Sequence, residues 1–417
     1  MADNRAEYAE ILKSILTDGI SLTNIKNTIA DKDRGFANML LMTTLRQLTF
    51  IKTEVLPKFV KKKIPQKQNI LEYLLYLGAA EVLFMNTPDY AVINSYVEAA
   101  KVKTDKFGAN FVNAVLRNIL RQKDTLLTER KSGYFSKNFL QILKQDYTAA
   151  EITEMEQFAA VEPPLDLTYK QGHLPEMADG NMLPTGSFRL PANTKVTEIN
   201  GFQEGIWWVQ DAASAIAVKC LSDLVGKRVL DFCAAPGGKT AQLLDAGAVV
   251  TAVDISNTRL NRLKENIDRL KLGKNLTTIC ADALHFTADI KFDIILLDAP
   301  CSATGTFRRH PEIMHTKTMA DVKKQAALQQ KILEHSISLL ATGGIILYAT
   351  CSLAKAEGER QMNNFLKSHP EFDILPIKTA ETEQMQTKEG FLRILPQAFD
   401  YFFGIDGFFV AVLKRKN

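Results

Sequence analysis

The first 145 residues show a hydrophobic pattern that is typical of helices. Between residues 8 and 16, apolar side chains recur at i, i+3, i+4, i+7 and i+8, which places them on one face of a helix. The same spacing recurs between residues 112 and 119 and begins again at 71–75. Glycine and proline are sparse here and fall between these stripes, as at Gly19 and Pro88. We therefore expect an all-α domain over residues 1–145.

The pattern changes between residues 146 and 205, where residues that break helices and strands become frequent. Pro163 and Pro164 are followed by Pro175, Pro184 and Pro191, and three glycines lie among them. Short apolar runs, such as residues 165–169, separate these positions. Short apolar runs separated by proline and glycine predict a small connecting α/β subdomain over residues 146–205.

From residue 206 onward, short apolar runs alternate with amphipathic stretches. Apolar runs predict strands at residues 228–232, 249–255, 276–280, 292–297 and 344–350, with helices between them that include a long one over 319–340. A helix near 358–367 is followed by apolar segments at 392–395 and 408–413, which are consistent with a closing hairpin. Alternating strands and helices are typical of a doubly wound parallel sheet, so we expect an α/β Rossmann-like domain over residues 206–417.

Composition narrows the class of protein. The chain has 46% hydrophobic and 24% charged residues, as soluble globular proteins do. No apolar run reaches the ~18 residues that a membrane span needs, and the first ten residues resemble neither a signal nor a transit peptide. Five cysteines without a CxxC pair argue against a disulfide framework and against a metal site. We expect a cytoplasmic protein with no membrane contact.

The basic residues are distributed unevenly. Residues 1–150 contain 22 Lys and Arg against 15 Asp and Glu, whereas the remainder carries a small acidic excess. Either the helical domain holds a polyanionic partner electrostatically, or its solvated surface is merely basic; the charge balance favours neither.

A small-residue loop follows the first predicted strand of the α/β domain. It lacks the GxGxxG of dinucleotide-binding loops, and although Gly238, Lys239 and Thr240 match the end of a P-loop, its first glycine would fall at Cys233. Such a loop between a strand and a helix is nevertheless a usual site for a nucleotide-like ligand.

Three acids lie at the ends of successive predicted strands: Asp254 closes the second, Asp282 follows the third and Asp298 closes the fourth. A carboxylate after the second strand suits a ribose diol, and one after the third suits the exocyclic amine of adenine. A single acid at such a position is as often only a loop cap. Three of them behind a loop of this kind favour a ligand site.

Two of the five cysteines stand where the chemistry of such sheets resides. Cys301 follows the fourth predicted strand and Cys351 the fifth, whereas Cys220 and Cys280 lie within elements, where cysteine is usually a buried apolar residue. One reaction that needs a cysteine at such a site is the methylation of cytosine at carbon 5. This carbon attacks a sulfonium methyl group only after a thiolate has added to carbon 6. Asp298 is placed to recognise the cytosine edge, and a second thiol could assist elimination. The spacing alone leaves open which thiol attacks.

Several segments together resemble the NOL/NOP/Sun family of RNA cytosine-C5 methyltransferases. In the α/β domain the resemblance rests on residues 209–214, 233–239, 298–302, 305–312, 350–352 and 407–413, with Asp254 and Asp282. Residues 33–37, 76–78, 88–94 and 113–117 resemble the NusB-type RNA-binding domain that some members carry. The resemblance covers nearly the whole chain, with Ala299 departing from the proline of many members.

The resemblance implies specific roles. Cys351 would attack carbon 6, and Cys301 would assist proton removal and product release. The substrate would be a cytidine of 16S ribosomal RNA, unassembled or partly assembled, with no obligate protein partner. The residues that would contact S-adenosylmethionine are Cys233, Ala234, Ala235, Pro236, Gly237, Gly238, Lys239, Asp254, Asp282 and Asp298.

Two other functions remain open from the sequence. The core could methylate a different RNA, such as a transfer RNA. Alternatively, the chain could be an RNA-binding assembly or antitermination factor with a vestigial catalytic domain, although the intact thiols, acids and glycine loop count against this. The basic residues Arg308, Arg309 and His310 either grip RNA phosphates or pair with acids of their own domain.

Overall fold

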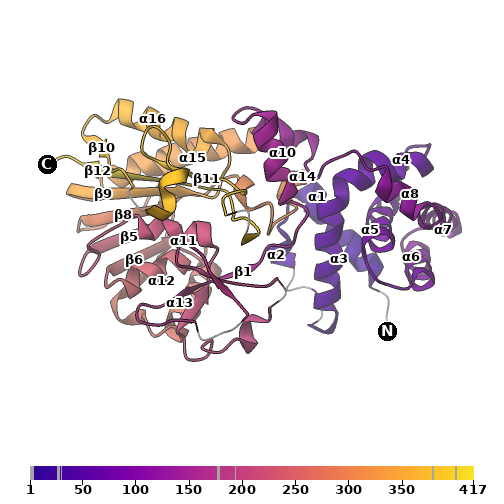
Figure 1. Ribbon diagram of the computed structural model, residues 1–417, viewed down its shortest axis with the longest axis horizontal. Coiled ribbons are helices and arrows are strands. Elements are labelled where there is room, and N and C mark those ends of the chain that lie inside the picture. Colours follow the sequence, from indigo (N-terminus) through magenta and orange to yellow (C-terminus); the bar gives the residue numbers. More distant parts are fainter. Residues whose placement is uncertain are drawn as a thin grey trace. The chain divides into compact units, whose positions relative to one another are not determined.

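The computed structural model describes residues 4–25, 29, 31–175, 179–192, 194–377, 380–399 and 402–417 (Figure 1). The chain forms two compact units. Residues up to Gln141 and the short segment His310–Lys317 form the first, and Ile142–Arg309 with Thr318–Asn417 form the second. Among the described residues, no helix has the length and apolarity needed to cross a membrane.

The first unit is helical, as expected. Leu74, Leu116 and Tyr96 lie fully buried in one continuous apolar core. Inside this core, the Glu81 carboxylate accepts hydrogen bonds from Arg5 Nη2 at 2.8 Å and from Tyr96 Oη at 2.9 Å, so this buried charge is paired. The described helices of the N-terminal region are α1 (Arg5–Asp18), α2 (Leu22–Ile25), α3 (Asp31–Phe50), α4 (Leu56–Phe59), α5 (Ile70–Phe84), α6 (Asp89–Lys103), α7 (Lys106–Arg121), α8 (Lys123–Thr128) and α9 (Lys137–Leu143).

A short helix from the later part of the chain also packs in the first unit. This helix, α14 (Ile313–Thr316), buries Met314 completely. Glu312 accepts a hydrogen bond from the backbone N–H of Leu22 at 3.3 Å, and His315 Nε2 lies 2.6 Å from the carbonyl oxygen of Leu45. No hydrophobic pattern or motif indicated that residues 310–317 would leave the α/β domain and join the helical one.

The second unit begins with α10 (Ala149–Gln157), which a capping box of Thr148 and Glu151 starts. A four-stranded antiparallel sheet follows in the order β2-β3-β1-β4, with β1 (Leu165–Tyr169), β2 (Asn181–Met182), β3 (Phe188–Leu190) and β4 (Trp207–Val209). The predicted connecting subdomain is therefore α/β, but its sheet extends past residue 205, because β4 pairs with β1.

The large sheet of the second unit has the strand order β10-β12-β9-β8-β5-β6-β7, and β11 pairs with β12. Strands β5 to β9 run parallel, whereas β10 and β11 pair antiparallel with β12, which confirms the predicted closing hairpin. The strands are β5 (Arg228–Phe232), β6 (Val249–Asp254), β7 (Leu276–Cys280), β8 (Phe292–Asp298), β9 (Leu340–Thr350), β10 (Phe372–Ile374), β11 (Leu392–Ile394) and β12 (Phe408–Arg415).

Helices cover both faces of this sheet. Alternate residues of β5 point to opposite faces, so Val229 packs with α13 on one face and Leu230 with α15 on the other. Figure 1 shows α12 and α13 on one side of the sheet and α15 and α16 on the other. The helices are α11 (Ala212–Lys219), α12 (Gly238–Asp245), α13 (Asn257–Arg269), α15 (Met319–Ile337) and α16 (Glu359–Ser368).

The Rossmann-like fold is thus confirmed, with one error of detail. The long helix was expected to reach residue 340 and the next strand to begin at 344. In the structure α15 ends at Ile337 and β9 already begins at Leu340. Residues 340–343, which the prediction placed before the strand, therefore belong to it, whereas Gly344, its expected first residue, lies in its interior.

Candidate functional site

The glycine-rich loop connects β5 to α12 at the carboxyl edge of the sheet. Gly237 has a φ of +101°, and a Cβ there would lie 2.8 Å from Cγ of Leu263. Asp254, buried at the end of β6, accepts hydrogen bonds from the backbone N–H of Ala235 at 3.2 Å and of Ser256 at 3.0 Å. Asp254 therefore connects the glycine-rich loop to the end of β6. A ligand bound at this edge of the sheet would contact the loop and the end of β6.

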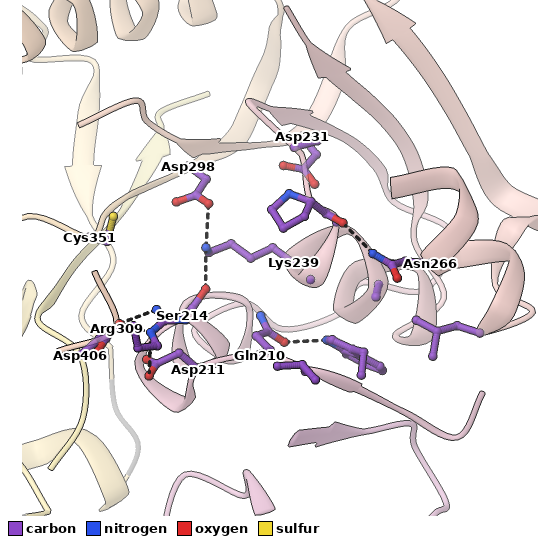
Figure 2. Close-up of a pocket in the computed structure, with 18 of the residues that line it drawn as sticks. Gln210, Asp211, Ser214, Asp231, Lys239, Asn266, Asp298, Arg309, Cys351 and Asp406 are labelled. Carbon is purple, nitrogen blue, oxygen red and sulfur yellow. Dashed lines mark hydrogen bonds and ion pairs between the residues drawn. The ribbon is translucent and has the colours of Figure 1, made fainter. Parts of the chain in front are cut away.

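A pocket of about 450 Å³ opens beside this loop (Figure 2). Lys239, the second residue of α12, extends into it and donates to Asp298 Oδ2 and to Ser214 Oγ, both at 2.8 Å. The ammonium also lies 5.1 Å from the ring centre of Phe408. Lys239 is almost fully buried, so its pairing with Asp298 offsets the cost of removing the charge from water.

Asp231 lines the same pocket at the end of β5. Its Oδ2 accepts from Thr240 Oγ1 at 2.6 Å, whereas its buried Oδ1 has no hydrogen-bond partner among the described residues. Burial raises the pKa of this carboxyl to about 7. The pocket therefore contains a carboxyl group with one oxygen available to a ligand donor.

The two cysteines meet at the ends of adjacent strands. β8 and β9 pair in parallel up to Asp298 and Ala349, so Cys301 and Cys351 emerge from the same edge, and their sulfur atoms lie 3.3 Å apart. Both are free thiols. The hydrogen bond with Cys351, and then burial, raises the pKa of Cys301 well above its ordinary value. Cys301 therefore keeps its proton and can donate it to the sulfur of Cys351.

The structure brings only part of the predicted site together. Ala234, Pro236, Gly237, Gly238, Lys239, Asp298 and Cys351 line the pocket, whereas Cys233, Ala235, Asp254, Asp282 and Cys301 do not. Burial raises the pKa of Cys233 to about 12, which makes it a poor thiolate. Asp282 has a side chain that is 40% exposed and accepts from the backbone N–H of Leu284 at 2.9 Å, as a loop cap does.

Besides Asp231, four charged residues line the pocket that were not among the predicted site residues: Asp211, Arg269, Arg309 and Asp406. Arg309 donates from Nε to Asp406 at 2.6 Å and lies 3.9 Å from Asp211, which also caps α11 (Figure 2). Arg309 thus pairs with acids of its own unit, as one of the two hypotheses for residues 308–310 held. Asp406 lies in a loop before β12 and has no motif by which sequence alone could have found it.

Comparison with known proteins adds to this geometry. Residues 218–414 match the family described as 16S rRNA methyltransferase RsmB/F, and residues 2–121 match the NusB family. The ribosomal RNA small subunit methyltransferase B of Serratia proteamaculans is 34% identical over 99% of this chain and 98% of its own length. The protein of the same name from Yersinia pestis is 33% identical over the same shares.

Two crystal structures resemble the chain in fold. PH0851 superposes over 100% of both chains with a TM-score of 0.75 at 21% identity. A methyltransferase homolog from Pyrococcus horikoshii covers 67% of this chain and 99% of its own, with a TM-score of 0.54 at 26% identity. Both support the architecture of a methyltransferase sheet.

Proposed function

The chain belongs to the RsmB/F family of methyltransferases, and from this premise we propose that it transfers a methyl group from S-adenosylmethionine to carbon 5 of a cytidine in 16S ribosomal RNA. The observation that carries the proposal is the pair of free thiols, 3.3 Å apart at the ends of β8 and β9. One of them, Cys351, lines the pocket together with Asp298 and Lys239.

The residues around the glycine loop fit the proposed cofactor. S-adenosylmethionine carries a sulfonium, an ammonium and a carboxylate. Its close approach to the loop needs small residues, its ammonium needs a hydrogen-bond acceptor, and its carboxylate needs a cation. Gly237 leaves no room for a side chain, Asp231 offers an unpartnered buried oxygen, and Lys239 supplies the cation. When bound, S-adenosylmethionine supplies an electrophilic methyl group. We assign residues 233–239, Asp254, Asp282 and Asp298 to its neighbourhood, with Asp282 the most peripheral of them.

Cys351 is proposed as the nucleophile. Its thiol first loses its proton to solvent. The sulfur then forms a bond to carbon 6 of cytosine, and the electron pair of the C5–C6 double bond moves so that carbon 5 can take the methyl group. Asp298 would accept from the exocyclic amine of the base, and Lys239 holds this carboxylate in place. Attack by a thiol at this position is what the RsmB/F resemblance implies and what its place in the pocket permits.

Cys301 is proposed to act in the second half of the reaction. Water takes up the C5 proton, the C5–C6 double bond forms again, and the bond between carbon 6 and the Cys351 sulfur breaks, leaving its electron pair on that sulfur. A thiol that keeps its proton 3.3 Å from the departing sulfur can donate a hydrogen bond to the leaving thiolate. This assigns unequal roles to two residues of the same type.

The helical unit is proposed to bind the RNA. Its match to the NusB family and the excess of seven positive charges in residues 1–150 support a polyanionic partner. A 16S substrate is supported by the names of the relatives, which cover nearly the full length of the chain. The transfer RNA alternative has no comparable support.

Two substitutions test the proposed chemistry. Cys351→Ala should abolish methyl transfer and form no covalent RNA adduct, whereas Cys301→Ala should accumulate an adduct that survives denaturing electrophoresis. Cys280→Ala is the matched control. The expectation that Cys280 is a buried apolar residue was wrong, because it is an exposed thiol at the end of β7, and it does not line the pocket. Bisulfite sequencing of 16S RNA from cells lacking the protein would locate the cytidine.

The opposite pattern would contradict these roles. An adduct in Cys351→Ala, or normal turnover in Cys301→Ala, would remove the assignment of the thiols. RNA binding without any methyl transfer by the wild-type protein would favour the assembly-factor hypothesis instead.

A further inference from the structure

A buried carboxylate lies beneath the two cysteine loops. Glu357 ends the short helix η7 (Lys355–Glu357), seven residues after the end of β9, and its side chain is completely inaccessible to solvent. It does not line the pocket, and no sequence motif marked it. A buried acid normally requires strong compensation, so its partners show what it does.

Four hydrogen bonds from neutral groups compensate the carboxylate. Its Oε1 accepts from the backbone N–H of Ser302 and from Gln329 Nε2, both at 2.9 Å. Its Oε2 accepts from Ser302 Oγ at 2.5 Å and from Ser352 Oγ at 2.6 Å. Because all the donors are neutral, the negative charge of Glu357 is solvated by the protein without being neutralised by a cation in these contacts.

The two serines stand directly after the two cysteines. Ser302 follows Cys301 at the end of β8, and Ser352 follows Cys351 at the end of β9. Their hydroxyl oxygens lie 3.2 Å apart, and Glu357 bridges both. Backbone pairing of β8 and β9 ends at Asp298 and Ala349. Beyond that point the loops are joined by this bridge, by the Gly305 N–H bond to the Cys351 carbonyl oxygen and by the contact of Thr304 Oγ1 with Ser352 Oγ at 3.1 Å.

Glu357 also acts on Cys301 through its charge. After the hydrogen bond with Cys351 and burial, the negative charges of Cys351 and Glu357 contribute to the raised pKa of Cys301. A nearby anion disfavours ionisation of a thiol, so this contribution has the expected sign. The same residue thus affects both where Cys301 lies and whether it carries a proton.

We propose that Glu357 is a positioning residue for the thiol pair, holding the loops of Cys301 and Cys351 together while its negative charge keeps Cys301 in the thiol form. This inference rests on the proposed function, in which a protonated Cys301 assists release of the base from Cys351. It adds a third participant that touches neither RNA nor cofactor.

The charge is tested on the full-length protein without RNA. The rate of Cys301 alkylation by iodoacetamide is measured against pH, with the Cys301 and Cys351 peptides separated by mass spectrometry. Glu357→Gln should move the midpoint of the Cys301 profile to lower pH, because one nearby negative charge is lost. Glu357→Asp keeps the charge, so a shift of equal size in that variant would assign the effect to loosened packing and overturn the proposed effect of the charge.

Glu334→Gln is the matched control for the loss of one negative charge from the same unit. Glu334 lies on the exposed side of α15, where it pairs with His369, and its substitution should leave the Cys301 profile unchanged. A midpoint for Glu357→Gln equal to that of the wild-type protein, in a variant with normal circular dichroism, would overturn the proposed effect of the charge.

The positioning is tested by Glu357→Asp and Ser352→Ala, which keep the charge. The shorter aspartate cannot reach both serines, and Ser352→Ala removes one of the four bonds. Both should slow methyl transfer at least tenfold and shift the Cys301 midpoint less than Glu357→Gln does, whereas a wild-type rate in both would overturn the proposal. If Glu357→Gln does not fold, the rates of methyl transfer by these two variants still test whether Glu357 positions the thiol pair. Because alkylation needs no RNA, failure of the cysteine assignment would appear separately, in the adduct assay.

Discussion

Two parts of the sheet edge hold their residues in place by different means. The glycine-rich loop is shaped by the positive φ of its own Gly237 and by Asp254 at the end of the next strand, nineteen residues after Ala235. The two cysteine loops instead depend on residues distant in sequence. Glu357 bridges Ser302 and Ser352, and the backbone of Gly305 packs against that of Gly407.

The difference follows from what each part must do. A loop that cradles a ligand needs one backbone shape, and a few small residues can encode it. Two thiols that must act on one base need a fixed distance between separate strands, which no local sequence can provide. Their spacing therefore relies on buried hydrogen bonds and close backbone packing, and it should be more sensitive to remote substitutions.

The largest expected effect tests that sensitivity at Gly305. A Cβ there would lie 2.0 Å from the carbonyl oxygen of Gly407, a backbone atom that cannot rotate away. Gly305 also donates to the carbonyl oxygen of Cys351 and accepts from Gly407, both at 2.9 Å. Gly305→Ala should lower the free energy of unfolding by about 3 kcal/mol and methyl transfer by roughly 100-fold, as overpacking beside a displaced catalytic group predicts.

Urea unfolding and a tritium-transfer assay would measure both changes. Gly273→Ala is the control, because a Cβ there meets its nearest atom at an ordinary 3.5 Å and its φ is negative. Should Gly305→Ala retain wild-type turnover, the cysteine loops would be as locally determined as the glycine loop, and the comparison would fail.

Most of the fold could be predicted from the sequence because most of it is encoded by local patterns. Helical spacing in residues 1–145, and alternating strands and helices after 206, reflect local patterns of burial. Residues whose position depends on distant partners were missed, as with Glu357, Asp406 and the segment His310–Lys317. Asp298 and Cys351 could be found because strand ends are visible in the sequence. Asp231 was overlooked although it lies near the end of β5, the strand that leads into the glycine-rich loop. The apolar pattern of residues 228–232 is that of any buried strand and did not mark the acid as a site residue.

A smaller effect concerns Asp231 and pH. Its pKa is raised to about 7 from the value near 4 of an exposed carboxyl, so the folded protein binds this proton more tightly than the unfolded chain. Stability from this group is complete below pH 4 and is lost as the pH rises through about 7. The wild-type protein should thus lose about 1 kcal/mol of unfolding free energy per pH unit near pH 6 through this residue.

Asp231→Asn removes the titrating group while its amide oxygen can still accept from Thr240. The difference in unfolding free energy between variant and wild type, measured by urea titration from pH 5 to 8, should grow in favour of the variant as the pH rises. A difference that stays constant would show that Asp231 does not titrate in this range, and that the pocket does not hold a protonated carboxyl.

The smallest effect is expected at Gly238, the first residue of α12. Its φ is negative, and an added Cβ would lie 3.3 Å from Cδ of Gln210, a side chain held by hydrogen bonds with Trp208 and Gln242. Alanine favours a helix over glycine by roughly 0.5–1 kcal/mol, which offsets this crowding, so Gly238→Ala should change the unfolding free energy by less than about 0.5 kcal/mol. Because Gly238 lines the pocket, the methyl group should instead weaken S-adenosylmethionine binding severalfold by calorimetry. If the conformation of the glycine loop is determined locally, Gly238→Ala should weaken cofactor binding while leaving the unfolding free energy almost unchanged. A large loss of stability would mean that the loop, like the cysteine edge, is held by its distant contacts.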